Sequence, residues 1–139
     1  MASFHFEILT PAKRVFSSEV SEVVLPAYDG EVGVLPEHGD FVGALGTGTL
    51  KIVKEGEDHW FMVSSGMYQV TEGRVTVFTD LAEGAPEVNI EVSKAKAAEL
   101  DAELRDVSKF SQENFPKLKL AYDRESARIE IHRRTRLVN

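Results

Sequence analysis

The sequence predicts a β plus α chain in two parts, with short antiparallel strands first and an antiparallel pair of helices after them. All ten glycines lie within the first 84 residues, where valine-rich segments alternate apolar and polar side chains. The remaining residues contain no glycine, and their apolar side chains repeat at helical spacing. Glycine favours turns between short elements, whereas its absence permits long helices. We therefore place a junction near Pro86 and expect domains at 1–88 and 89–139.

Alternation in the first part has the period of two that is typical of half-buried strands. The first such segment places Phe4, Phe6 and Ile8 on one face and ends at Thr10. Further strands are expected at 15–25, 31–35, 49–54, 59–64, 67–71 and 75–79. Their spacing of about 8–12 residues is typical of an antiparallel sandwich or barrel. The expected core contains Phe4, Phe6, Val24, Leu35, Leu50, Ile52, Phe61, Val63, Val70, Val75 and Val77.

Two helices are expected in the second part, at 91–108 and at about 115–136, and the short link between them indicates an antiparallel hairpin. The first helix carries one apolar stripe, formed by Ala97, Leu100, Leu104 and Val107. The second carries two stripes on nearly opposite sides, namely Leu118, Tyr122 and Ile129, and Leu120, Ala127 and Ile131. Because one stripe suffices to pack on the first helix, the other must meet the strand domain, a partner or water.

Charge is distributed unevenly along the chain. The net charge is −7, which argues against binding of nucleic acid by the protein as a whole. Residues 1–90 carry 5 basic and 14 acidic side chains, whereas residues 116–139 carry 7 and 3. In the second helix Lys117, Arg124 and Arg128 form a basic row between the two apolar stripes. This row is either a solvated charged face or a surface that docks on an acidic partner.

Motifs of catalysis and metal binding are missing from the sequence. There is no cysteine, the four histidines stand at no metal-ligand spacing, and no phosphate-binding loop or nucleophile elbow occurs. No apolar run reaches about 18 residues, and the N-terminus does not resemble a secretory signal. These observations favour a non-enzyme without a metal or a cofactor, built from a rigid β module and a helical arm for protein contacts.

Three stretches of the sequence carry a specific resemblance. They are 26–38 (PAYDGEVGVLPEH), 44–52 (ALGTGTLKI) and 63–70 (VSSGMYQV), the last followed by VTVFTD at 75–80. In this order they resemble the epsilon subunit of bacterial F-type ATP synthase. The resemblance implies a sandwich of about ten strands followed by a helical hairpin. It also implies a non-catalytic rotor subunit that binds the gamma subunit and the ring of c subunits, and couples proton flow to rotation.

Site residues follow from the resemblance alone. Glu31 and His38 match positions at the contact with the c-ring and gamma. The arm of such subunits can extend to the alpha and beta subunits and block ATP hydrolysis, through a basic face that matches Lys117, Arg124, Arg128, Arg133 and Arg134. Since no transit peptide is visible, we expect a bacterial protein, peripheral on the cytoplasmic face of the cell membrane.

Some members of this family bind ATP through an Ile/Leu-Asp-x-x-Arg-Ala motif at the start of the first helix. Here residues 90–95 read IEVSKA, so that Glu91 and Lys94 replace the aspartate and the arginine. Lysine lacks the planar fork that grips a phosphate with two hydrogen bonds. A further family arginine aligns with Asp101, although Arg124 and Arg128 match the arginines of the second helix. The sequence therefore predicts that ATP binding is weak or absent.

Two other functions remain open at the level of sequence. The chain could be a small-ligand-binding β module with the hairpin as its lid, or an enzyme whose site shows no recognisable motif. A rotor subunit should bind gamma and remain with the solubilised synthase. A lid protein should instead be monomeric and retain a small molecule.

Overall fold

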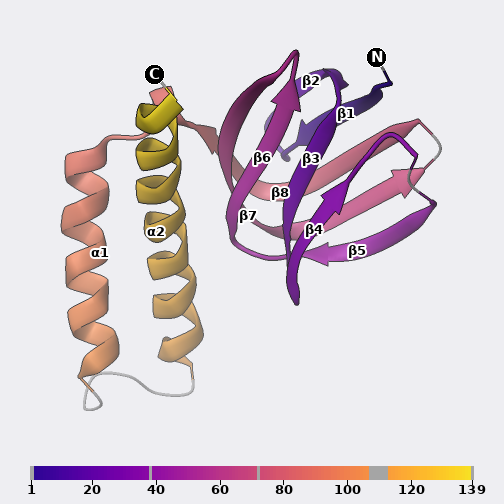
Figure 1. Ribbon diagram of the computed structural model, residues 1–139. Coiled ribbons are helices and arrows are strands. Elements are labelled where there is room, and N and C mark those ends of the chain that lie inside the picture. The colour runs from indigo at the N-terminus through magenta and orange to yellow at the C-terminus, as the bar shows by residue number, and fades with distance from the viewer. Residues whose placement is uncertain (1, 38, 72, 107–112, 139) are drawn as a thin grey trace.

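The computed structural model describes residues 2–37, 39–71, 73–106 and 113–138, and within them eight strands precede a short 3-10 helix and two α-helices (Figure 1). The elements are β1 (Phe4–Leu9), β2 (Arg14–Val20), β3 (Glu22–Ala27), β4 (Gly30–Val34), β5 (Phe41–Leu45), β6 (Gly48–Lys54), β7 (Glu57–Thr71), β8 (Arg74–Gly84), η1 (Ala85–Glu87), α1 (Ile90–Arg105) and α2 (Asn114–Val138). The last strand thus ends at Gly84, and α1 begins at Ile90. Asn89 is the N-cap of α1, since its side chain accepts a hydrogen bond from the Val92 N–H at 3.2 Å.

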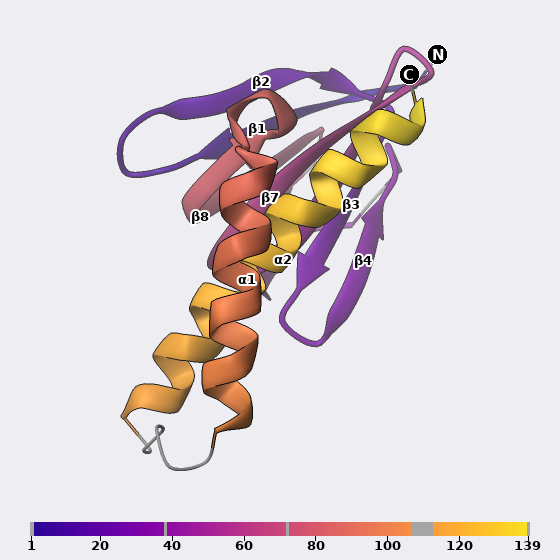
Figure 2. The same cartoon turned by 90° about the vertical axis from the view of Figure 1, so that its left-hand side faces the viewer.

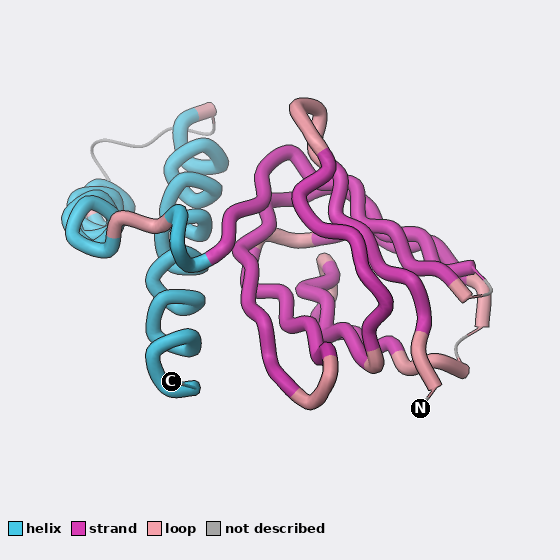
Figure 3. Tube along the Cα trace, turned by 90° about the horizontal axis from the view of Figure 1, so that it is seen from above, coloured by secondary structure: helices cyan, strands magenta, loops and turns pink. Residues whose placement is uncertain are grey.

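The strands fold over one another into a sandwich, as predicted. Their order is β2-β1-β8-β7-β5-β3-β4, and β6 lies off this path, paired with β3 and β7. The pairs are antiparallel except for β1 and β8, which run parallel. Viewed from above, the strands wrap around a common interior while both helices stand at one side (Figure 3).

Strands β7 and β8 are long because each serves both layers of the sandwich. The first half of β7 pairs with β6 up to Val63, and its second half pairs with β5 from Gly66 onward. In a regular strand, residues an odd number of positions apart point to opposite faces. Val63 and Tyr68 are five positions apart and both are buried, so side-chain alternation reverses between the two halves of β7. The implied count of about ten strands is therefore corrected to eight among the described residues, because two strands continue through the bend.

The main core contains most of the expected side chains, and two expectations about it are wrong. Leu35 is exposed just beyond β4, and Val24 lies half-buried on the outer face of β3 while Val23 and Leu25 point inward. The expected single strand at 15–25 is two strands, because the chain turns at Ser21 between β2 and β3. Strand β5 was not expected, and β8 continues five residues past its expected end.

The two helices form the expected antiparallel hairpin, and α2 is the one that packs against β6 and β7 (Figures 1 and 2). Ala127 and Ile131 are buried there with Met62, and Trp60, Leu81 and Val88 pack around them. The stripe of α2 that contains Ala127 and Ile131 thus meets the strand domain, which was the first of the three alternatives left open by the sequence. Val107, together with the expected end of the first helix at 108, lies outside the described residues. No helix in the described part of the chain combines the length and apolarity that crossing a membrane requires.

Candidate functional site

Helix α2 lies along the first half of β7 in the opposite direction, and three arginines mark this contact. The Nε of Arg124 donates to Ser64 Oγ at 2.6 Å, near the middle of β7. Arg128 contacts Glu83 of β8, and the guanidinium of Arg134 lies 5.2 Å from the centre of the Trp60 ring. Since this contact also contains the small apolar cluster around Ile131, polar and apolar contacts together hold the arm, defined as α1 and α2, on the sandwich.

Arg128 is the best-anchored of the three. Its Nε and one terminal nitrogen donate to the two carboxylate oxygens of Glu83 at 2.8 and 3.1 Å, and the other terminal nitrogen donates to Glu125 at 2.9 Å. The hydrogen bonding that Arg128 donates to Glu83 is the main cause that raises the pKa of Arg128. Two-pronged pairs of this kind are stronger and more directional than single hydrogen bonds. Arg128 therefore fixes both the position and the rotation of α2.

The predicted basic face does not stand free in this arrangement. Arg124 and Arg128 are turned toward the sandwich. Arg133 and Arg134 both pair with Glu130 on their own helix, at 2.6 and 2.8 Å, whereas Lys117 is exposed near the other end of α2. The inhibitory role of these residues stays a prediction, and it would require Arg124 and Arg128 to leave their present partners.

Glu31 is exposed on β4, which forms one edge of the sheet. It lines a shallow pocket whose other walls are Val24, Thr49, Lys51, Trp60 and Arg134. Tyr28, in the turn just before β4, is 82% exposed. His38 lies outside the described residues, so the structure places only one of the two predicted contact residues.

The four positions considered for ATP are not gathered at one site. Glu91 and Lys94 are exposed on α1, and neither lines the cavity of about 190 Å³ between η1, α1 and α2. Arg128 does line it, but so do the carboxylates of Glu83, Glu87 and Glu125, with Lys96 as the second cation. Arg124 points to Ser64 instead. A polyphosphate in this cavity would meet three carboxylates, which disfavours its binding.

The sequence reasoning missed an apolar row on the outer face of the sandwich layer that α2 does not cover. Leu9, Phe78, Met67 and Ala44 are register partners across β1, β8, β7 and β5, and we call them the apolar row. Met67 and Phe78 are 42% and 40% exposed. Together with Thr10 and Gly66 they line a hollow of about 530 Å³. The alternation of residues 67–71 and 75–79 places these side chains outward, but it does not tell whether anything covers them.

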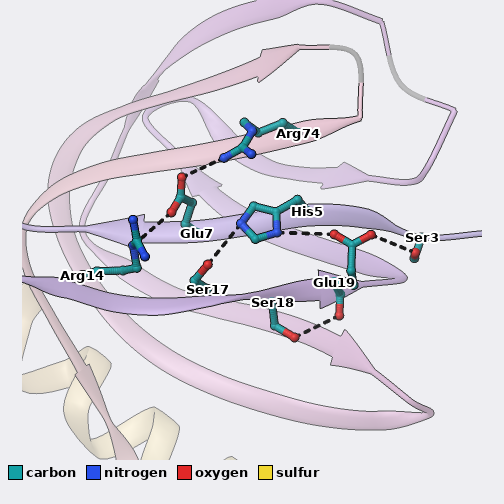
Figure 4. Close-up of polar contacts among 8 residues, drawn as sticks. All are labelled: Ser3, His5, Glu7, Arg14, Ser17, Ser18, Glu19 and Arg74. Carbon is teal, nitrogen blue, oxygen red and sulfur yellow. Dashed lines mark hydrogen bonds and ion pairs between the residues drawn. The ribbon is translucent and has the colours of Figure 1, made fainter.

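Beyond the row, the same face becomes polar (Figure 4). Glu7 is almost buried there between Arg14 and Arg74, at 3.2 and 3.0 Å. His5 lies between Ser17 and Glu19 of β2, with its ring nitrogens 3.1 and 3.3 Å from their oxygens. These contacts join the edge strand β2 to β1 and β8, so that one sheet face has an apolar half and a charged half.

Comparison with known proteins shows the family to which the chain belongs. The model of the β-sandwich domain of the ATP synthase delta/epsilon chain matches residues 3–85, which is more than half of this chain. The chain is 40% identical to the ATP synthase epsilon chain of Desulforamulus reducens, with 89% of this chain and 92% of the relative covered. It is 37% identical to that of Ruminiclostridium cellulolyticum, over 98% and 100% of the two chains. The chain belongs to the family of ATP synthase epsilon chains.

Solved structures agree on the fold. A chain of the mitochondrial ATP synthase of Euglena gracilis superimposes with a TM-score of 0.79 at 19% identity, covering 99% of this chain and 82% of that one. A chain from the central stalk and c-ring of the Tetrahymena thermophila enzyme gives 0.57 at 11% identity, covering 94% of each chain. As an epsilon chain the protein is a non-catalytic subunit of the F-type ATP synthase, which leaves the small-ligand lid hypothesis without support.

Proposed function

We propose that this chain is the central-stalk subunit that binds gamma and the c-ring, couples their rotation to the catalytic head, and carries its arm as a retractable brake on ATP hydrolysis. The observation that carries the proposal is the way the arm is held. Its apolar contact is a small cluster separate from the main core of the sandwich, and its charged contacts use the residues of the predicted inhibitory face. Release of the arm therefore leaves the main core of the sandwich intact.

The apolar row and the hollow beside it are the surface that we assign to gamma. Its four side chains cross four adjacent strands, a span of roughly 14 Å at ordinary strand spacing. This face belongs to the layer that the arm does not cover, so it is available whether the arm is docked or extended. Exposed apolar side chains gathered in this way are typical of a protein interface.

The edge formed by β4 is the surface that we assign to the c-ring. Glu31 is an exposed carboxylate there, suited to hydrogen bonds or ion pairs with polar loops, and Tyr28 adds an exposed aromatic ring in the adjacent turn. His38, the other predicted contact, would act with them. Contact with the ring would hold the chain, as a peripheral protein, at the cytoplasmic face of a bacterial membrane.

In this proposal the sandwich and the beta subunit compete for the same arginines of α2. In the docked state Arg124 and Arg128 satisfy Ser64 and Glu83. In an extended state, with the arm among the alpha and beta subunits, they would meet acidic residues of beta instead. One set of arginines cannot serve both partners at once, so conditions that strengthen docking weaken inhibition. We propose no cofactor, and ATP acts on this arm weakly or not at all.

The test is ATP hydrolysis by reconstituted synthase with and without residues 90–139. We expect the shortened chain to fold, to bind gamma and to assemble, and the complex that contains it to hydrolyse ATP faster. Equal rates would show that the arm is no brake here. Failure of the full chain to bind gamma in a pull-down would contradict the rotor function itself.

A further inference from the structure

The kink in β7 at Ser64–Gly66 lies between the docked arm and the apolar row. Ser65 has a φ of 47° and Gly66 a φ of 138°, and at these residues β7 passes from one layer of the sandwich to the other. A positive φ at a residue other than glycine is uncommon and persists only where the surroundings enforce it. The conformation of the kink is therefore held by its surroundings, and its two ends lie next to the docked arm and next to the apolar row.

Buried hydrogen bonds enforce the kink. The Ser64 N–H donates to Thr79 Oγ1 at 3.1 Å, and the Thr79 hydroxyl lies 2.8 Å from the carbonyl oxygen of Ser65. Ser64 and Thr79 are both buried. Ser65 Oγ donates to Asp80 of β8 at 3.3 Å. The hydroxyl of Thr79 thus clamps the backbone of β7 at the point where it changes layer.

Both functional surfaces touch this clamp. On the arm side, Arg124 of α2 donates to the buried Ser64 Oγ. On the other side, Gly66, Met67, Phe78 and Thr79 line the hollow of the apolar row. The backbones of β7 and β8 are close together at this point, since a Cβ on Gly66 would lie 1.9 Å from the carbonyl oxygen of Phe78. A shift of the β7 backbone at Gly66 would therefore press on the backbone of β8 at Phe78.

We infer that the Ser64–Gly66 kink couples docking of the arm to the shape of the apolar row, with Arg124 as the positioning residue. When α2 leaves, Ser64 Oγ loses its cationic donor, and the clamp relaxes toward a different arrangement of Met67 and Phe78. Coupling between binding sites is reciprocal, so a partner that prefers one shape of the row also shifts the arm. The inference rests on the proposed function only in naming gamma as that partner.

Methionine-methyl NMR on the full chain tests the coupling without a partner. The chain has three methionines, and two of them report the two surfaces: Met62 lies beneath α2, and Met67 lies in the apolar row. We expect Arg124→Ala to move the Met67 resonance. The matched control is Arg133→Ala, which removes an arginine of the same helix whose described contact is with Glu130 alone, and it should leave Met67 in place.

Each result decides the matter. A Met67 resonance that stays in place in Arg124→Ala overturns the inference, whether or not Met62 shows that the arm has left. Equal movement in Arg133→Ala also overturns it, because the effect would then not pass through Ser64. Ser64→Ala should reproduce the shift with α2 still docked, and absence of a shift there overturns the clamp.

Addition of gamma tests the reciprocal effect. We expect gamma to move the Met62 resonance although it binds the other face, and Arg124→Ala to change the affinity for gamma by roughly fivefold or more. A chain that binds gamma without moving Met62 contradicts the coupling. A chain that does not bind gamma contradicts the proposed function instead, while the Met67 measurements on the free chain still decide the coupling.

Discussion

Arg128 of α2 and Glu83 of β8 face each other through two parallel hydrogen bonds, of 2.8 and 3.1 Å, and both side chains are only 20% exposed. The pair joins the arm to the sandwich beside an apolar cluster of three buried side chains. Because that cluster is small, we expect the ion pair to contribute to the docking of the arm. An arm attached in this way can be released by changes in charge, which an arm built into the main core could not.

Arg128→Ala should weaken docking of the arm by about 1–3 kcal/mol, because it leaves the buried Glu125 and the partly buried Glu83 without their cation. Trp60 is the only tryptophan of the chain and packs beneath α2, so its fluorescence reports docking. We expect red-shifted emission and faster amide exchange in α2. Arg133→Ala is the matched control and should leave the Trp60 emission unchanged, because Arg133 pairs with Glu130 on its own helix. An unaltered spectrum in Arg128→Ala would show that apolar packing alone holds the arm.

Acid should loosen the C-terminal part of α2. The hydrogen bond from Arg133, with that from Arg134, holds the pKa of Glu130 below its ordinary value of 4.5. A lowered pKa means that the carboxylate stabilises the folded helix above that ordinary value, and that this contribution is lost as the pH falls through the lowered pKa. We expect a small loss of helix below about pH 4.5 by circular dichroism. The Glu130→Gln variant should show a weaker pH dependence, and an identical profile would contradict the assignment.

Met67→Glu should abolish or strongly weaken binding of gamma while leaving the fold intact. Met67 is half-exposed at the centre of the apolar row, so a carboxylate there remains solvated in the free chain but is desolvated in a complex. We expect a loss of at least tenfold in affinity by calorimetry, and a melting temperature close to that of the parent. His59→Glu provides the control, since it adds the same charge to an exposed position of β7 outside the row. Equal effects of both changes would argue for general repulsion.

The sequence predicts the class of fold because the two parts differ in composition and periodicity. The prediction fails where consecutive apolar residues show no alternation. Val23, Val24 and Leu25 are consecutive apolar residues, so alternation could not tell that Val24 is the one that points outward. The short strand β5 contains Gly43 and follows a loop, and it lacked the run of β-branched residues that marks the other strands.

The candidate site was harder to predict than the fold. The arginines of α2 were recognised, but Ser64, Glu83 and Trp60, which they contact, are far away in sequence, and no pattern links them to α2. The split expected at Gly66 marked a real feature, because glycine signals a close approach of backbone, but the strand bends there instead of ending. Whether an outward face is covered depends on tertiary structure, so the apolar row could not be found from alternation.

Gly66→Ala should destabilise the sandwich by roughly 2–4 kcal/mol, since the added methyl group would collide with the Phe78 carbonyl and the residue would keep a φ of 138°. Gly39→Ala is the matched control, because nothing lies within 4 Å of a Cβ at that position. Urea unfolding should show a clear loss for the first variant and almost none for the second. Equal midpoints would mean that the kink adjusts freely.

ATP should bind the isolated chain weakly or not at all, and the structure suggests which residues prevent it. Arg128 is already satisfied by Glu83 and Glu125, and the cavity it lines also holds Glu87. A phosphate would have to displace a carboxylate and then remain among the others. We expect no heat of binding at micromolar ATP in a calorimetric titration. Restoring the family motif through Glu91→Asp and Lys94→Arg should raise the affinity only slightly, because neither residue lines the cavity. Adding Glu83→Gln removes one of the three carboxylates of the cavity and should raise the affinity further. Micromolar affinity in the parent chain would show that the carboxylates reorganise around the ligand and would overturn this account.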